Sequence, residues 1–184
     1  MLIVQKFGGS SLADIERLRR AAGICLEARR REHKLIVVVS ASGDVTDELV
    51  EAARQIDPRP PLRELDALMA TGEQQSAALM AIMLRSMGAP AISFSGWQAG
   101  IFTGEQHGAA PIGLIMPGRL EAALDEGKIA VVAGFQGLSP LGDVTTLGRG
   151  GSDTTAVALS AALGAARCEI YTDVDGIYTA DPRL

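Results

Sequence analysis

The chain has 184 residues, of which 47% are hydrophobic, 4% aromatic and 21% charged, and its formal net charge is -5 at pH 7. This acidic balance gives no support to nucleic acid or an anionic membrane as a partner, because both select basic surfaces. The start of the chain lacks the pattern of a signal peptide and no apolar run approaches the ~20 residues of a membrane span, so we expect a cytoplasmic protein.

The first half of the chain alternates between short apolar runs and stretches with apolar residues at helical spacing. Runs such as LIVQK and KLIVVVS predict strands buried on both faces, and the longer stretches predict the helices that cover them. In order, we expect a strand over 2–6, a helix over 12–32, a strand over 34–40, a helix from Thr46, a loop over 57–61, and a helix over 62–87 that is interrupted at Thr71 and Gly72.

The second half continues the alternation after one irregular segment. In order, we expect a strand over 89–96, a glycine-rich irregular segment over 97–117, a helix over 118–126, a strand over 128–135, a loop, a helix over 152–164 and a strand over 168–173. Strands that alternate with helices favour an α/β fold, here a three-layer αβα sandwich with a mostly parallel central sheet. Cys25 and Cys168 lie in regular apolar patterns, which predicts two buried thiols and no disulfide.

Each of the five predicted strands ends in small or polar residues. KFGGSS, SASGDVTD, SGWQAG, GFQG and TDVDG follow the strands in that order. Ligands of a parallel sheet bind beyond the carboxyl ends of its strands, so we expect these stretches to form one site. Tight turns alone would explain any one of them, but are a weak explanation for all five.

The first of these strand ends has the features of an anion site. Gly8 and Gly9 remove side chains where a strand meets a helix, so backbone N–H groups and the positive helix end can approach a phosphate. Lys6 directly precedes them and supplies a point charge suited to a phosphoryl group. The G-x-x-x-x-G-K-[ST] and G-x-G-x-x-G signatures are both absent, which excludes a P-loop protein and a dinucleotide fold of that type.

A second glycine-rich stretch, LGRGGSDTT, precedes the predicted helix over 152–164. Arg149 can bind a carboxylate through two parallel hydrogen bonds, and Gly150 and Gly151 have no side chains that would block a ligand. Asp153 could orient the lysine of the first strand or hold a metal ion. The alternative for Ser152 and Asp153 is simple N-capping of the helix.

Glu73 lies in an apolar helical stretch, where an unpaired carboxylate is costly. Arg63 and Arg85 are too distant along the helix to pair with it, so we interpret Glu73 as the holder of a cationic ligand. His107 lies in the irregular segment and is a weaker candidate for a substrate contact. Neither histidine has the spacing of a metal site.

The stretches VQKFGGSS, VVVSASGDVTDEL, LMATGEQ, SGWQAGI, VVAGFQG, TTLGRGGSDTTAVALSAAL and EIYTDVDGIYTADPR occur in this order and cover the chain nearly end to end. Together they strongly resemble the aspartokinases of the amino acid kinase superfamily. SGWQAGI and TLGRGGSDTTA separate these enzymes from their acetylglutamate, glutamate and uridylate kinase relatives. The resemblance implies transfer of the ATP γ-phosphoryl group to the β-carboxylate of L-aspartate, the entry step to lysine, threonine and methionine.

The resemblance also implies roles for individual residues. Lys6 would stabilise the transferring group, with Asp153 orienting it and Arg149 completing the catalytic set. The expected ATP-binding residues are Lys6, Phe7, Gly8, Gly9, Thr172, Asp173, Tyr178, Thr179, Ala180, Asp181, Pro182 and Arg183. The expected substrate-binding residues are Ser40, Thr46, Glu73, Arg149, Gly150, Gly151 and Ser152. Mg²⁺ is expected with ATP, held largely through water and phosphate oxygens rather than at a protein metal site.

By the same resemblance, residues 1–184 correspond to the front of an amino acid kinase catalytic domain. Aspartokinases continue with more kinase domain and usually with ACT regulatory domains, so we expect a chain truncated on its C-terminal side that forms a homo-oligomer or associates with a regulatory part. Two alternatives stay open: a non-catalytic nucleotide-binding or interaction module of this family, and a relative that phosphorylates another acceptor.

Overall fold

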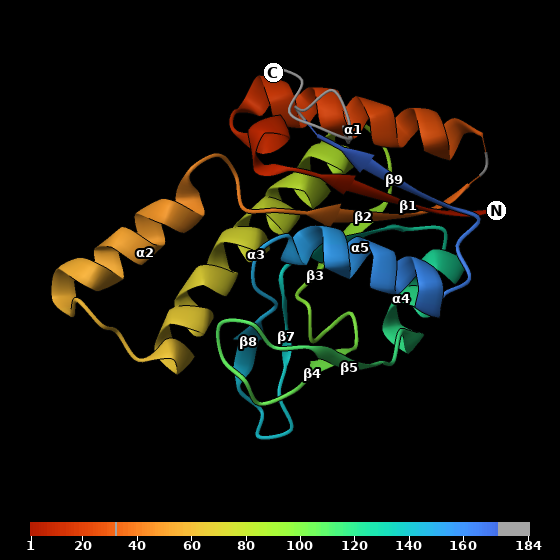
Figure 1. The fold of residues 1–184 in the computed structure, drawn as a ribbon. Helices are drawn as coiled ribbons and strands as arrows, with labels where there is room; N and C mark the ends of the chain where they lie inside the picture. Colours follow the sequence, from red (N-terminus) through yellow and green to blue (C-terminus); the bar gives the residue numbers. More distant parts are fainter. Residues whose placement is uncertain (32, 173–184) are drawn as a thin grey trace, which may run out of the picture.

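A five-stranded sheet forms the centre of the structure, a computed structural model in which residues 1–31 and 33–172 are described (Figure 1). Its strand order is β3-β6-β2-β1-β9, and every neighbouring pair is parallel. The strands are β1 (Leu2–Phe7), β2 (Lys34–Val39), β3 (Ala91–Phe94), β6 (Ile129–Ala133) and β9 (Arg167–Tyr171). The prediction of a parallel central sheet is therefore confirmed.

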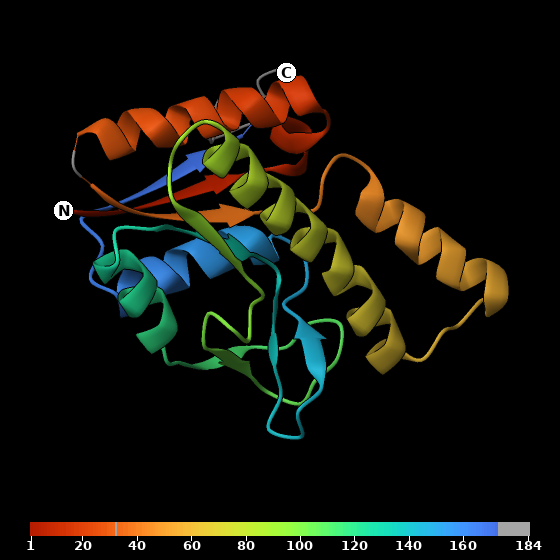
Figure 2. The same cartoon turned by 180° about the vertical axis from the view of Figure 1, so that it is seen from behind.

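Helices cover both faces of this sheet (Figures 1 and 2). One face packs against α1 and α3, and the other against α4 and α5. Their bounds are α1 (Ile15–Arg30), α3 (Leu62–Ser86), α4 (Gly118–Asp125) and α5 (Gly151–Ala162). A further helix, α2 (Val45–Ile56), lies beside α3 and away from the sheet. The arrangement confirms the predicted three-layer αβα fold.

Strand β2 shows why an unbroken apolar run marks the centre of the sheet. Leu35, Val37 and Val39 pack toward α1 and α3, and the residues between them, Ile36 and Val38, pack toward α4 and α5. All five side chains are buried, because a strand between two helical layers has no face in water. The same alternation directs Lys6 of β1 toward α5.

A second, four-stranded sheet lies beside α3 and α5, with the order β5-β4-β7-β8. Its strands are β4 (Ile101–Thr103), β5 (Ile112–Ile115), β7 (Gln136–Leu138) and β8 (Val144–Thr146). The prediction of irregular structure over 97–117 was thus wrong, and so was the prediction of a loop after residue 135. Strands of three or four residues are too short to show a periodic pattern, and β4 pairs with β7 from a distant part of the chain.

The predicted helices differ from the observed ones most at the start of α1 and in the middle of α3. The helix predicted from residue 12 begins at Ile15, because the N–H of Arg17 donates to Asp14 Oδ1 at 2.7 Å and caps it there. A short 3₁₀ turn, η1 (Gly9–Leu12), precedes it. The interruption predicted at Thr71 and Gly72 was wrong, since α3 is continuous through both residues.

Gly72 is required by packing and not by a break in α3. A Cβ atom at this position would lie 2.9 Å from Ala41 Cβ, on the turn after β2. Gly23, in the middle of α1, is the matched control, because among the described residues no atom beyond its chain neighbours and the backbone of its own helix lies within 4 Å of its ideal Cβ position. We therefore expect opposite effects from the same substitution in two helix interiors.

Gly23→Ala is expected to raise the free energy of unfolding by about 0.5–1 kcal/mol, the gain in helix propensity. Gly72→Ala is expected to lower it by about 1–3 kcal/mol, because the added methyl group overpacks a rigid contact and outweighs that gain. Urea denaturation of both variants checks this. A stabilising Gly72→Ala would show that the turn after β2 moves freely.

The two cysteines have different environments. Cys25 is buried in the core under α1, as predicted. Cys168 is exposed, so the prediction of a second buried thiol was wrong. It lies on β9, one of the two edge strands of the central sheet as described. In the described part of the chain, no helix combines the length and the apolar character needed to cross a bilayer.

Candidate functional site

A cavity of about 200 Å³ lies at the carboxyl end of the central sheet. Its walls come from β1, from the segment after β2, from α2 and α3, and from the loop that joins β8 to α5. The lining residues are Lys6, Ser40, Thr46, Glu73, Phe135, Gly148, Arg149, Gly150, Gly151, Ser152 and Asp153. The three predicted catalytic residues and all seven predicted substrate-binding residues therefore share one cavity, although they come from distant parts of the chain.

Lys6 and Asp153 form an ion pair across this cavity. Lys6 Nζ lies 2.8 Å from Asp153 Oδ1, and the lysine is buried while the aspartate side chain is 46% exposed. A buried ammonium group needs a partner, and the carboxylate supplies it from the first turn of α5. Because an ammonium group has three N–H donors, this pair leaves donors of Lys6 for a ligand in the cavity.

The N-terminus of α5 faces the same cavity without a side-chain cap. Its cap residue is Gly150, with a left-handed φ of 71°, and no side chain of the described residues forms a capping hydrogen bond at this helix end. The N-capping role considered for Ser152 and Asp153 is therefore not observed; both lie inside the helix. The partial positive charge of this helix end is directed at the cavity, where it favours an anion.

Phe135 lines the cavity and was not among the predicted site residues. Its φ of 69° is left-handed, a strained conformation for a residue with a side chain. Two hydrogen bonds hold it: its N–H donates to Thr155 Oγ1 at 3.1 Å, and its carbonyl accepts from the N–H of Leu147 at 2.9 Å. A Cβ atom on Gly151 would lie 2.7 Å from Phe135 Cδ2, so the phenyl ring packs directly on the start of α5. The only sequence signal was its place at a strand end.

Glu73 is a buried carboxylate with one free oxygen. It is 3% exposed; its Oε1 accepts the N–H of Ala41 at 3.0 Å, and its Oε2 has no partner among the described residues. Burial raises the pKa of Glu73 to about 7, and the hydrogen bond from Ala41 opposes this only in part. A buried carboxylate oxygen at a cavity wall is an acceptor for a cationic ligand, as the sequence interpretation of Glu73 requires.

The turn after β1 is held by its neighbours on both sides. The carbonyl of Gly9 accepts the N–H of Gly43 at 3.0 Å, and a Cβ atom on Gly9 would lie 2.5 Å from the carbonyl oxygen of Ala41. Gly9 is therefore glycine because two loops approach closely. Gly8 donates its N–H to Tyr171 O at 3.3 Å, and a Cβ on Gly8 would lie 3.7 Å from Lys6 Nζ.

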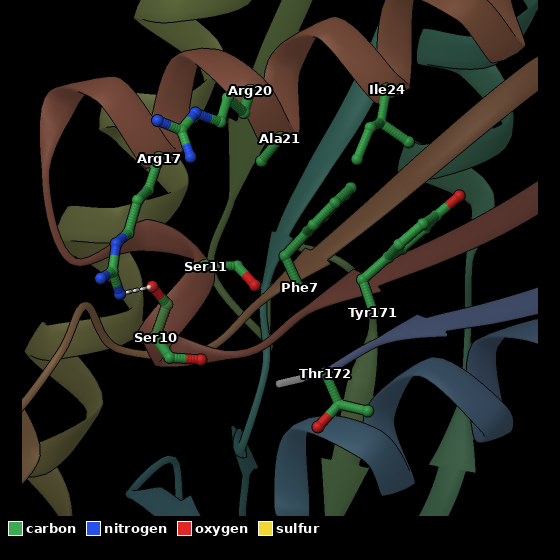
Figure 3. Close-up of a pocket in the computed structure, with 9 residues that line it drawn as sticks. All are labelled: Phe7, Ser10, Ser11, Arg17, Arg20, Ala21, Ile24, Tyr171 and Thr172. Carbon is green, nitrogen blue, oxygen red and sulfur yellow. Dashed lines mark hydrogen bonds between the residues drawn. The ribbon is translucent and has the colours of Figure 1, made fainter. Parts of the chain in front are cut away.

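A second cavity, of about 590 Å³, lies between α1 and the ends of β1 and β9 (Figure 3). Its lining residues are Phe7, Ser10, Ser11, Arg17, Arg20, Ala21, Ile24, Tyr171 and Thr172. The rings of Phe7 and Tyr171 stack at a centroid distance of 4.7 Å. Phe7 thus directs its ring toward α1, on the opposite face of β1 from Lys6.

The predicted nucleotide residues are divided among three places. Lys6 lines the smaller cavity, and Phe7 and Thr172 line the larger one. Gly8 and Gly9 form the turn between them. The remaining members lie outside the described residues: Asp173, Tyr178, Thr179, Ala180, Asp181, Pro182 and Arg183.

His107 does not line either of the two cavities. Its Nδ1 lies 2.9 Å from Asp66 Oδ2, and Asp66 is completely buried. Asp66 was not predicted as a functional residue, because a single carboxylate in a helical pattern gives no signal of a distant partner.

The chain matches the family model described as "Amino acid kinase family" over residues 1–184. It is 59% identical over 184 residues to an aspartokinase of Mycolicibacterium smegmatis, covering all of this chain and 44% of that protein. A crystal structure of aspartate kinase from Synechocystis superposes with a TM-score of 0.86 at 49% identity, covering 100% of this chain and 30% of that one. E. coli aspartokinase III in complex with aspartate and ADP gives a TM-score of 0.88 at 30% identity, covering 100% and 52%. The chain spans less than half the length of the curated relatives it matches.

Proposed function

The chain belongs to the amino acid kinase family, and from this premise we propose that the protein containing it is an aspartate kinase. The proposed reaction transfers the γ-phosphoryl group of ATP to the β-carboxylate of L-aspartate. One observation carries the proposal: Lys6, Arg149 and Glu73 line a single cavity, and Oε2 of Glu73 has no hydrogen-bond partner among the described residues. The relatives named aspartokinase, one of them solved with aspartate and ADP, support the choice of substrates.

The charges of the cavity are complementary to those of aspartate. The substrate carries one ammonium group and two carboxylates. Glu73 would hold the ammonium group, Arg149 would grip the α-carboxylate, and the β-carboxylate would face Lys6 and the N-terminus of α5. Ser40 and Thr46 add hydroxyl groups to the same wall. A cavity of this size and polarity selects a small zwitterion over an extended or apolar molecule.

The chemistry needs positioning and charge neutralisation more than it needs a base. A carboxylate is already a nucleophile, so the cost lies in bringing two anions together. Lys6, oriented by Asp153, would neutralise charge on the transferring group, and the open end of α5 would add its dipole.

Magnesium would bind with the nucleotide. In the described ranges, no group of three or more His, Cys, Asp or Glu residues could hold a metal ion. The half-exposed carboxylate of Asp153 fits an ion that keeps most of its water and takes its other ligands from phosphates. When bound, Mg²⁺ would supply further neutralisation of the phosphate oxygens.

ATP-dependent formation of aspartyl hydroxamate by the intact protein tests this function. Hydroxylamine traps the acyl phosphate, so the signal requires both transfer and a carboxylate acceptor. Turnover with glutamate, acetylglutamate or a nucleoside monophosphate in place of aspartate would redirect the proposal to another acceptor. Calorimetric binding of ATP without transfer to any acceptor would favour a non-catalytic module.

Arg149→Ala is expected to raise KM for aspartate about 30-fold and to leave KM for ATP within about twofold. Arg149 is exposed and makes no ion pair with the described residues, so its loss leaves no buried group unpaired in the free protein. Steady-state kinetics in both substrates check this. Arg59→Ala removes an exposed arginine outside the cavity and should change neither constant. Equal effects of Arg149→Ala on both KM values would contradict a role at the amino acid.

A further inference from the structure

Asp66, on α3, forms hydrogen bonds with two other segments: the loop that joins β4 to β5, and the end of β8. Its Oδ1 accepts the hydroxyl of Thr146 at 2.6 Å, and both its oxygens accept the N–H of Gly108, at 3.2 and 3.0 Å. Oδ2 also lies 2.9 Å from His107 Nδ1. The carboxylate is completely buried and has no lysine or arginine partner among the described residues. Hydrogen bonds from three residues therefore hold it in place of a salt bridge to a strong cation.

These contacts lie directly behind the loop that carries Arg149. Thr146 is the last residue of β8, and its carbonyl accepts the N–H of Ala110 at 2.8 Å. Gly148 packs on the same segment, since a Cβ atom there would lie 3.5 Å from both Gly108 O and Ala109 Cβ. The segment at 107–110 thus supports the loop from β8 to the cavity wall.

The position of Arg149 depends on the backbone of its loop. Gly148 and Gly150, on either side of Arg149, have φ values of 80° and 71°. The Arg149 side chain makes no ion pair with the described residues, so its position depends on where the backbone of the loop is held. α5 fixes one end of the loop, and the other end is fixed by Thr146 together with the hydrogen bond from the N–H of Leu147 to the carbonyl of Phe135 at 2.9 Å.

We propose that Asp66 and His107 form a brace that positions the Arg149 loop for the substrate carboxylate. The inference rests on the proposed function for its substrate. His107 and Asp66 are positioning residues, because neither lines the cavity. A displacement of about 1 Å at a substrate-binding group can cost up to about 10²-fold in rate or affinity, which sets the scale of the effect.

His107→Leu and Thr146→Val each remove one donor to Asp66. Each is expected to raise KM for aspartate about tenfold, with KM for ATP unchanged and kcat within about threefold. His107→Asn restores a donor near the position of Nδ1 and should return KM for aspartate to within about threefold of the wild type. Thr145→Val is the matched control: it deletes the neighbouring buried hydroxyl of β8, which contacts Thr103 and not Asp66.

Amide hydrogen exchange of the ligand-free protein gives a readout that is independent of turnover. We expect faster exchange at residues 147–150 in His107→Leu and Thr146→Val, and wild-type exchange there in His107→Asn and Thr145→Val. A lower melting temperature with unchanged KM for aspartate and unchanged exchange of this loop would overturn the brace. If the wild type transfers no phosphoryl group to aspartate, the proposed function fails, and the exchange data still decide the brace. Should His107→Leu not fold, Thr146→Val carries the same two measurements.

Discussion

Lys6→Met in the intact protein is expected to lower kcat for phosphoryl transfer at least about a thousandfold, with KM for aspartate changed less than about threefold. Methionine keeps an unbranched apolar stem of similar length and removes the charge and the N–H donors of the ammonium group. Lys6 is the buried cation that lies opposite Asp153 in the cavity, so its loss removes the charge expected to act on the transferring group. Hydroxamate formation at saturating and limiting substrate measures both constants.

The variant should remain folded, which makes the kinetic result interpretable. Asp153 is half-exposed and can be solvated when its partner is gone, so no unpaired charge is left in the core. Lys34→Met is the control: Lys34 pairs with Asp125 at 2.6 Å at the opposite end of the sheet and should leave kcat unchanged. If the Lys6→Met protein turned over at the wild-type rate, Lys6 would have no role in phosphoryl transfer.

Asp153→Asn helps to separate orientation from charge. If Asp153 acts by orienting Lys6, its amide variant should lose about tenfold in kcat, far less than loss of the lysine itself. An equal loss in both variants would instead indicate that the carboxylate contacts the phosphates or their metal ion.

The layers of the fold could be predicted because the inner strands β2 and β6 carry unbroken apolar runs, over 35–39 and Ile129–Ala133. Val37 and Val38 are buried on opposite faces of β2, and a sequence of such residues has no other stable place in a protein of this class. The second sheet could not be predicted. Its strand β7 (Gln136–Leu138) pairs with β8 and β4, and the register depends on contacts that no local window contains.

The site was predictable for a topological reason. Parallel strands bring their carboxyl ends to the same side of the sheet, so Lys6 and Ser40 had to meet once the strands were assigned. The stretch around Arg149 follows β8 of the second sheet, and only its glycines, its charge and the family resemblance indicated that it belongs to the site. Phe135 and Asp66 were not predicted from the sequence. The left-handed backbone of Phe135 is imposed by Thr155 and its neighbours, and the partners of Asp66 lie far along the chain.

Glu73→Gln should separate the function of the site from the stability of the fold. At pH 8 the variant is expected to lose about 10³-fold in kcat/KM for aspartate, because a neutral amide replaces the buried charge opposite the ammonium group. In the wild type, affinity for aspartate should fall as the pH drops below about 7, where Glu73 becomes protonated in the free protein. The variant should lack this pH dependence, and Glu51→Gln, at an exposed glutamate of α2, should behave as the wild type.

As the pH rises, the affinity for aspartate should increase, whereas the contribution of Glu73 to the stability of the ligand-free protein should decrease. Burial raises the pKa of Glu73 from 4.5 to about 7, so between these pH values the folded state holds a proton that the unfolded state releases. The contribution of Glu73 to the stability of the wild type is therefore fullest below pH 4.5 and is lost as the pH rises through 7. Glu73→Gln has no such loss, and at pH 8 its free energy of unfolding should exceed that of the wild type by up to about 3 kcal/mol, with no difference at pH 4.

Urea denaturation at pH 4 and pH 8, without substrates, measures this difference. A glutamine variant that is less stable than the wild type at pH 8 would show that Oε2 of Glu73 has a partner in the free protein, and the carboxylate would then be structural. If the variant is instead more stable and cannot bind aspartate, the buried charge opposes folding and is retained for the ligand. Aspartate should in that case stabilise the wild type more strongly at pH 8 than at pH 6, since binding places a cation beside the ionised carboxylate.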